Sequence, residues 1–74
     1  MSNLKDTMLS SLKTHAEGNK NMHISNVKIY LENPVGIGEH PQHLDEIDKL
    51  FQKIADAQEK LKVIEDFRGE RSAL

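Results

Sequence analysis

The chain has 74 residues, of which 36% are hydrophobic and 30% are charged, and it contains no cysteine. A chain of this length forms a single domain that buries only about 60% of its unfolded surface. Without cysteine, disulfides and thiolate zinc sites are excluded as stabilising elements, which leaves association with other chains. The formal net charge of −2, with both signs interleaved, lacks the basic stripe typical of nucleic-acid binding, so nucleic acid is not an expected partner.

The first candidate helix begins near the N-terminus. Apolar side chains and a histidine recur there at helical spacing, at Leu4, Met8, Leu12 and His15. Ser2 or Asn3 is suited to cap the helix. A polar segment around Gly18 follows, and a glycine inside a helix costs about 1 kcal/mol relative to alanine. The first arm is therefore either one long helix or two pieces hinged near Gly18.

Residues 22–31 admit two interpretations. As a strand, Val27, Ile29 and Leu31 share one face, and β-branched residues favour it. As a helix, Ile24, Val27, Tyr30 and Leu31 share a face. A lone strand would have no second strand to pair with, because no other segment alternates clearly. We therefore favour a helix that ends at Asn33, since Pro34 disfavours helical geometry in the preceding residue.

The segment from Asn33 to Pro41 contains two glycines and two prolines and is long enough to reverse the chain. Pro41 is tolerated in the first turn of a second helix. That helix carries an apolar stripe at steps of three and four, at Leu44, Ile47, Leu50, Phe51, Ile54, Ala57, Leu61 and Ile64. Such a stripe is typical of a coiled-coil-like hairpin or bundle. Ala57 is small enough for a partner backbone to approach closely, and Gly69 offers a stop.

The sequence thus predicts an all-α protein consisting of one helical-hairpin domain, residues 1–74. The antiparallel helices span about 3–32 and 41–67, with a connecting loop at 33–40, a frayed tail at 69–74, and association into an oligomeric bundle. The residues predicted to form interfaces are the apolar positions of the second helix and two of the loop: Ile47, Leu50, Phe51, Ile54, Leu61, Ile64, Val35 and Ile37. Six apolar or aromatic residues are expected to stay partly open: Leu44, Phe51, Tyr30, Ile29, Val35 and Ile37.

Candidate chemistry is sparse. Glu39, His40 and His43 are proper metal ligands, but a closed site needs a further group, His15 or His23, from the other arm. The Gly36-x-Gly38 turn lacks the strand and the additional residues of a phosphate-binding loop. No nucleophile elbow or catalytic triad spacing is present. We predict a protein that is not an enzyme and has no catalytic, cofactor or metal site.

No apolar run approaches the roughly 20 residues that cross a bilayer. The N-terminus also lacks the apolar centre of a secretory signal. We therefore expect a soluble protein that is made in a cytoplasm and has no membrane partner.

Two stretches carry a family resemblance: Thr14 to Gly18, and Asn26 to Pro41 with its core string Asn-Pro-Val-Gly-Ile-Gly-Glu-His at residues 33–40. The chain resembles small uncharacterised proteins of T-even-like and marine tailed bacteriophages, in which a similar string joins two predicted helices. The resemblance covers Thr14 to about Ile64. It implies a phage source, but it brings no activity and no functional residues.

Two hypotheses about function follow. The first is a structural or assembly protein of a phage virion, made in the host cytoplasm, that docks its hairpin onto itself or a larger virion protein. The second is a small phage-encoded adaptor or regulator that binds a host or replication protein in the cytoplasm. The step from resemblance to virion component is an association and not a physical derivation.

Overall fold

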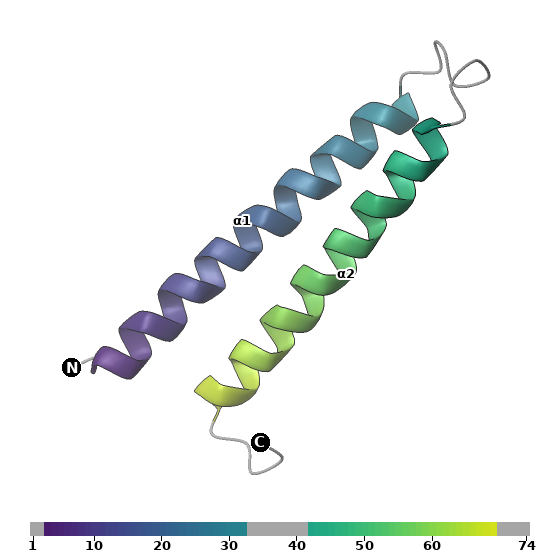
Figure 1. The fold of residues 1–74 in the computed structure, drawn as a ribbon. Coiled ribbons are helices and arrows are strands. Elements are labelled where there is room, and N and C mark those ends of the chain that lie inside the picture. The colour runs from purple at the N-terminus through teal and green to yellow at the C-terminus, as the bar shows by residue number, and fades with distance from the viewer. Residues whose placement is uncertain (1–2, 33–41, 70–74) are drawn as a thin grey trace.

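The computed structural model describes residues 3–32 and 42–69. Within these ranges the chain forms two helices, α1 (Leu4–Glu32) and α2 (Gln42–Arg68), and no strand. The helices pack side by side in opposite directions, so that the start of α1 and the end of α2 lie at the same end of the molecule (Figure 1). The predicted all-α antiparallel hairpin is confirmed, with helix ends no more than one residue from those expected.

Helix α1 is continuous, which decides both questions left open by its sequence. Residues 22–31 are helical, and Gly18 lies inside the helix without a break. Val27 is buried against α2, so its packing outweighs the preference of a β-branched residue for strands. The cost of one glycine is small beside the packing of a 29-residue helix.

Both helices have recognisable ends. The side-chain Oδ1 of Asn3 accepts a hydrogen bond from the backbone N–H of Asp6 at 2.8 Å, which identifies Asn3 as the cap of α1. The hydroxyl of Thr7 also donates to the carbonyl of Asn3 at 3.1 Å. At the other end of the chain, the N–H of Gly69 donates to the carbonyl of Glu65 at 2.8 Å. Helix α2 therefore ends beside Gly69, as predicted. The expected loop at 33–40 lies outside the described residues, as does most of the tail.

The contact between the helices is a heptad seam. On α2 it follows the predicted stripe: Ile47, Leu50, Ala57 and Ile64 are buried, and Ile54 and Leu61 are half-buried. On α1 seven of the buried and half-buried positions recur at steps of four and three: Leu9, Lys13, Ala16, Lys20, His23, Val27 and Tyr30. Asn19 and Ile24 are half-buried beside them. Such steps keep one side of each helix facing its partner.

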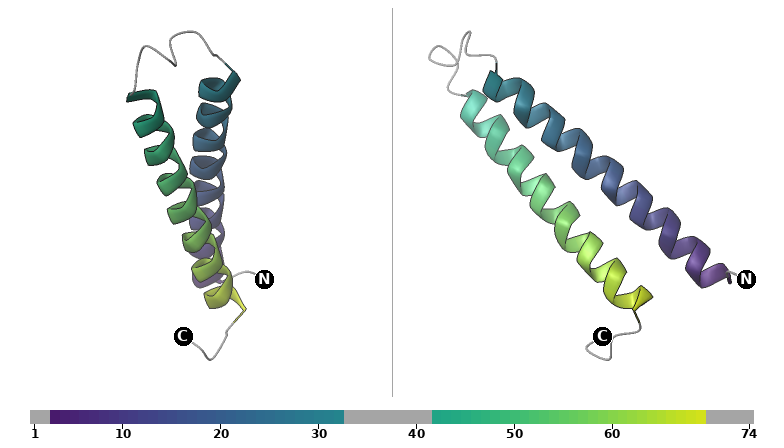
Figure 2. Two further views of the ribbon diagram at one scale, coloured as in Figure 1. Left: turned by 90° about the vertical axis from the view of Figure 1, so that its right-hand side faces the viewer. Right: turned by 180° about the vertical axis from the view of Figure 1, so that it is seen from behind.

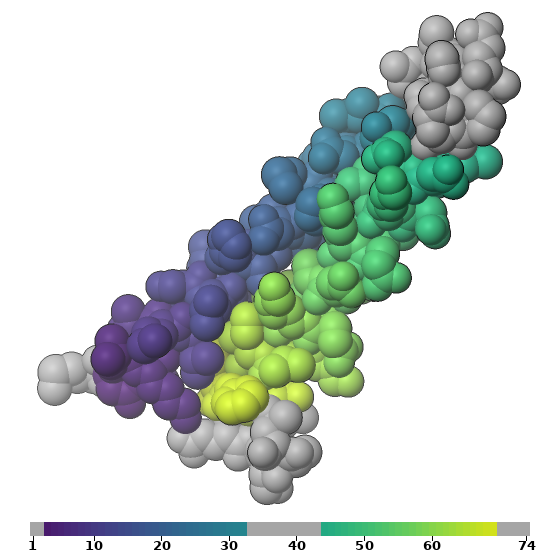
Figure 3. All heavy atoms as spheres, viewed as in Figure 1, coloured from purple at the N-terminus to yellow at the C-terminus, as the bar shows by residue number. Residues whose placement is uncertain are grey.

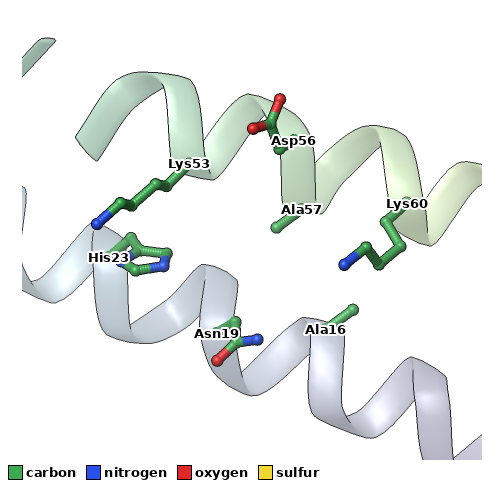
Figure 4. Close-up of a pocket in the computed structure, with 7 residues that line it drawn as sticks. All are labelled: Ala16, Asn19, His23, Lys53, Asp56, Ala57 and Lys60. Carbon is green, nitrogen blue, oxygen red and sulfur yellow. The ribbon is translucent and has the colours of Figure 1, made fainter. Parts of the chain in front are cut away.

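The seam of α1 is not the apolar pattern that its sequence displays most clearly. Leu4, Met8 and Leu12 are exposed to 74%, 56% and 53%. Ala16 occupies the middle of the seam instead and is only 2% exposed, opposite Ala57 at 7%. The two alanines point into the space between the helices (Figure 4). Two methyl groups at this level permit the close approach expected at Ala57.

The hairpin is long and thin. Its principal extents are 55 × 24 × 13 Å, so it is about one helix thick, because an α-helix with its side chains is about 10–12 Å across. Its radius of gyration is 16.6 Å, whereas a compact domain of this length would have about 11 Å. The two helices are inclined to each other when seen from the side (Figure 2). Neither described helix is long and apolar enough to span a membrane.

Replacing Asn3 by alanine should lower the free energy of unfolding by about 1 kcal/mol, because the N–H of Asp6 loses its acceptor. Urea denaturation followed by far-UV circular dichroism measures the change. Asn21→Ala, at an exposed position inside α1, is the matched control and should not destabilise. Equal effects of the two substitutions would show that Asn3 does not cap the helix.

Replacing Ala57 by leucine should destabilise the hairpin by roughly 1–3 kcal/mol, because the added methylenes have no room opposite Ala16. Ala55→Leu places the same side chain on an exposed position of α2 and should change stability by less than about 0.5 kcal/mol. The two variants are compared by urea denaturation at one protein concentration. If Ala57→Leu is as stable as the control, the helices do not approach closely at the alanines.

Candidate docking surface

The side of α1 that faces away from the seam forms a second heptad pattern. Its positions recur at steps of four and three, and all of them are exposed: Leu4, Met8, Ser11, His15, Gly18, Met22, Ser25 and Ile29. We call these eight residues the outer strip. With about 100° of rotation per residue, the strip lies about a third of a turn around α1 from the seam. It is about 38 Å long at 1.5 Å per residue.

The outer strip contains no lysine, arginine, aspartate or glutamate. Between Met8 and Ile29 the charged residues of α1 are Lys13, Glu17, Lys20 and Lys28, none of which belongs to the strip. Lys13 and Lys20 even lie in the seam, half-buried. A helix packed against one partner normally turns its charged residues to water and its apolar residues to the partner. On α1 this arrangement is partly reversed.

Helix α2 shows the ordinary arrangement. Its side opposite the seam carries Asp45, Asp48, Gln52, Asp56 and Glu59, all exposed. Charged residues of both signs flank this side, and Lys49 lies 3.5 Å from Glu46. This face is suited to water. The contrast between the helices makes the outer strip of α1, and not the outside of α2, the candidate docking surface.

The strip exposes large apolar side chains next to small ones. Met22 is 52% exposed and Ile29 is 62% exposed, whereas Ser11, Gly18 and Ser25 leave room beside them. Apart from its neighbours in the chain and the adjoining backbone of α1, no atom lies within 4 Å of the position that a Cβ on Gly18 would occupy. A shallow depression lies over Ser10, Ser11, Thr14 and His15. The space-filling view shows the two helices lying against each other along the hairpin (Figure 3). The surface therefore offers both projections and recesses to a partner.

A second feature lies between the helices beside the alanine contact (Figure 4). It is a groove of about 160 Å³ lined by Ala16, Asn19, His23, Lys53, Asp56, Ala57 and Lys60. Small-molecule sites usually occupy about 300–1,000 Å³ and are mostly apolar. This groove is smaller than that and has polar side chains around it.

Polar residues in the seam of α1 make limited contacts. Lys13 Nζ lies 3.9 Å from a carboxylate oxygen of Glu65, with both side chains more than a third exposed, so this pair adds little stability. Glu65 is also 3.8 Å from Arg68. The Nδ1 atom of His23 is buried and has no hydrogen-bond partner. The seam therefore holds the hairpin together mainly through α2's apolar side chains.

The interface residues predicted from sequence are mostly occupied within the hairpin. Ile47, Leu50 and Ile64 are buried, and Ile54 and Leu61 are half-buried in the seam. Phe51 alone among those described stays largely open, at 53%. Leu44 and Ile29 are exposed and Tyr30 is half-buried, as expected. Val35 and Ile37 lie outside the described residues.

The outer strip was not identified from sequence as a surface. Leu4, Met8, Leu12 and His15 stood out only as the start of a helix. One feature of the sequence could have indicated the strip: the positions at heptad spacing from Leu4 to Ile29 are all uncharged. It becomes meaningful only once the seam is known to lie on another side of α1.

The histidines considered for a metal site do not assemble one among the described residues. His15 is exposed, with its Nε2 3.2 Å from Nδ2 of Asn19. His23 lines the groove instead. Within residues 3–32 and 42–69 no group of three or more potential ligands comes together. Glu39 and His40 lie outside these ranges, and nothing is described of the His43 side chain.

No protein-family model, no curated protein and no solved structure matches this chain.

Replacing His23 by leucine should raise the free energy of unfolding by about 1 kcal/mol, because a buried nitrogen without a partner is replaced by apolar surface against α2. Asn21→Leu, at an exposed position of the same helix, reports how much of the gain comes from helix propensity alone. Urea denaturation compares the two variants. A gain no larger than that of Asn21→Leu would show that His23 is not in an unfavourable environment.

Proposed function

We propose that this chain is a non-enzymatic structural or assembly protein that docks onto other protein through the outer strip of α1. The observation that carries the proposal is the absence of charge from a strip about 38 Å long on a helix whose other positions carry four lysines, two glutamates and one aspartate. Exposed apolar surface of this extent is typical of interaction sites. Exposure of Met8, Met22 and Ile29 to water does not stabilise the hairpin, whereas their burial against another protein would.

The shape of the molecule supports the same function. The hairpin is about one helix thick, and its described pockets are a small polar groove and a shallow depression. A surface of this kind suits contact with another protein better than it suits binding and turning over a small substrate. In the proposed function the hairpin acts by contact with protein, and no catalytic side chain takes part.

The proposal extends to the setting in which the docking takes place. The string at residues 33–40 resembles small phage proteins, which supports a phage source. We propose that this short helical chain is a component of the virion. It would be made in the host cytoplasm and be present in several copies on the particle. An adaptor that stays in the cytoplasm with a host or replication protein is the other outcome that the experiment must distinguish.

The test is mass spectrometry of particles purified from a phage that encodes this chain. Peptides of the chain should be present in the particles. Met22→Glu places a charge in the middle of the outer strip and should reduce the amount in the particles by more than about tenfold, because a buried unpaired charge is costly. Gln58→Glu, an exposed change on α2, is the matched control and should leave incorporation unchanged.

Two results would contradict the proposal. If the chain is absent from particles but is recovered from infected cells bound to a host or replication protein, it is an adaptor. If Met22→Glu enters the particles as efficiently as Gln58→Glu at equal expression, docking does not use the outer strip.

A further inference from the structure

We infer, building on the proposed docking function, that the outer strip of α1 packs against the outer strip of a second copy of this chain, with the two α1 helices antiparallel. The partner is identified by the sizes of the side chains along the strip. Its alternating steps of four and three read the same from either end, as they do in any heptad stripe with an even number of positions. Two antiparallel copies can therefore bring every strip position level with another strip position.

This arrangement matches side chains by size. The pairs placed at the same level are Leu4 with Ile29, Met8 with Ser25, Ser11 with Met22, and His15 with Gly18. In each of the three inner pairs a large side chain meets a small residue or none, and the outermost pair joins two large apolar side chains. A two-fold interface is self-complementary in this way, because residue i contacts j and j contacts i. Interdigitation of large and small residues allows the density of a protein interior.

The surface of the hairpin has features that correspond to these pairs. The depression over Ser10, Ser11, Thr14 and His15 lies where Met22 of the second copy would insert. The open space at Gly18 lies where His15 of the second copy would insert. Methionine is flexible and adapts to such recesses. Parallel copies would instead place Met22 against Met22 and Gly18 against Gly18, which leaves clashes at some levels and gaps at others.

Charge also favours a second copy. Two identical charged surfaces repel each other unless their charges interleave, but the strip has no charged residue and meets its copy without that cost. Among the charged residues of α1, Lys13 and Lys20 lie half-buried in the seam. The others are exposed and lie outside the strip: Lys5, Asp6, Glu17, Lys28 and Glu32. The acidic outside of α2 stays in water in the resulting four-helix bundle.

Sedimentation of the purified full chain at several concentrations tests the dimer. Wild type and Gln58→Glu should sediment at twice 8.4 kDa, and Met22→Glu should raise the dissociation constant by more than about tenfold while its helicity stays unchanged. Phe51→Glu alters the main exposed aromatic of mid-α2, which is 53% exposed, and should leave the dimer intact. A monomeric wild type would overturn the inference, as would a dimer broken by Phe51→Glu and not by Met22→Glu.

Disulfide formation tests the orientation, because the chain has no cysteine of its own. Ser11→Cys and Met22→Cys are prepared as separate proteins and oxidised alone or mixed. In antiparallel packing only the mixture should cross-link, because Ser11 is level with Met22 of the other copy. Identical cysteines would be roughly 16 Å apart along the axis, beyond the ~4.4–6.8 Å Cα separation of a disulfide. Cross-linking of each protein with itself would show a parallel dimer and overturn the proposed pairing.

The inference and the proposed function can fail separately. A dimer that forms through the outer strip but never enters a particle would contradict only the virion function. A monomer whose incorporation into particles is lost in Met22→Glu would contradict only the second copy as partner.

Discussion

The structure depends on one contact, the packing of the apolar seam of α2 against α1 around Ala16 and Ala57. Neither helix would be stable alone in water, because most helical stability in proteins comes from packing of one face and not from propensity. Ala16 and Ala57 face the space between the helices (Figure 4). Both alanines are buried, as are Leu50 and Ile64 of the same seam. Local features, such as the Asn3 cap, add about a kilocalorie per mole to this contact.

The same contact determines which side of α1 is left outside. Turning Ala16 and Val27 toward α2 also turns Lys13, Lys20 and His23 toward it. Lysines can occupy such positions because their apolar stems can be covered while the ammonium groups stay in water. Leu4, Met8, Met22 and Ile29 are then left on the outside. In a protein that stays monomeric, these apolar side chains would remain in water, which is unfavourable. In the proposed dimer they would be buried.

A hairpin of one helix thickness has limited means of covering such a strip. Its own second helix already packs on another side of α1, and no described residue covers the strip. Under the proposed function, another protein chain covers it. The proposed virion role and the proposed self-association are compatible, because many copies of a small protein on a particle would meet one another as well as a larger partner. The match of large and small side chains along a charge-free strip is the reason for proposing a copy of the same chain.

The sequence by itself determined α2 and its seam, because Ile47, Leu50, Ala57 and Ile64 keep a heptad period, and Asn3 and Gly69 mark helix ends. It favoured a helical first arm but left open whether residues 22–31 form a strand and whether the helix breaks at Gly18. It could not determine the seam of α1. Periodicity is read from apolar residues, but Lys13, Lys20 and His23 occupy three of the seven positions of that seam, and Leu4, Met8 and Leu12 supply a clearer pattern on another side. Only the tertiary structure shows which of the two sides of α1 packs against α2. That side is the one on which Ala16 lies opposite Ala57 and covers the apolar seam of α2. The outer strip can be recognised as a surface only once it is known which side of α1 the helix α2 covers.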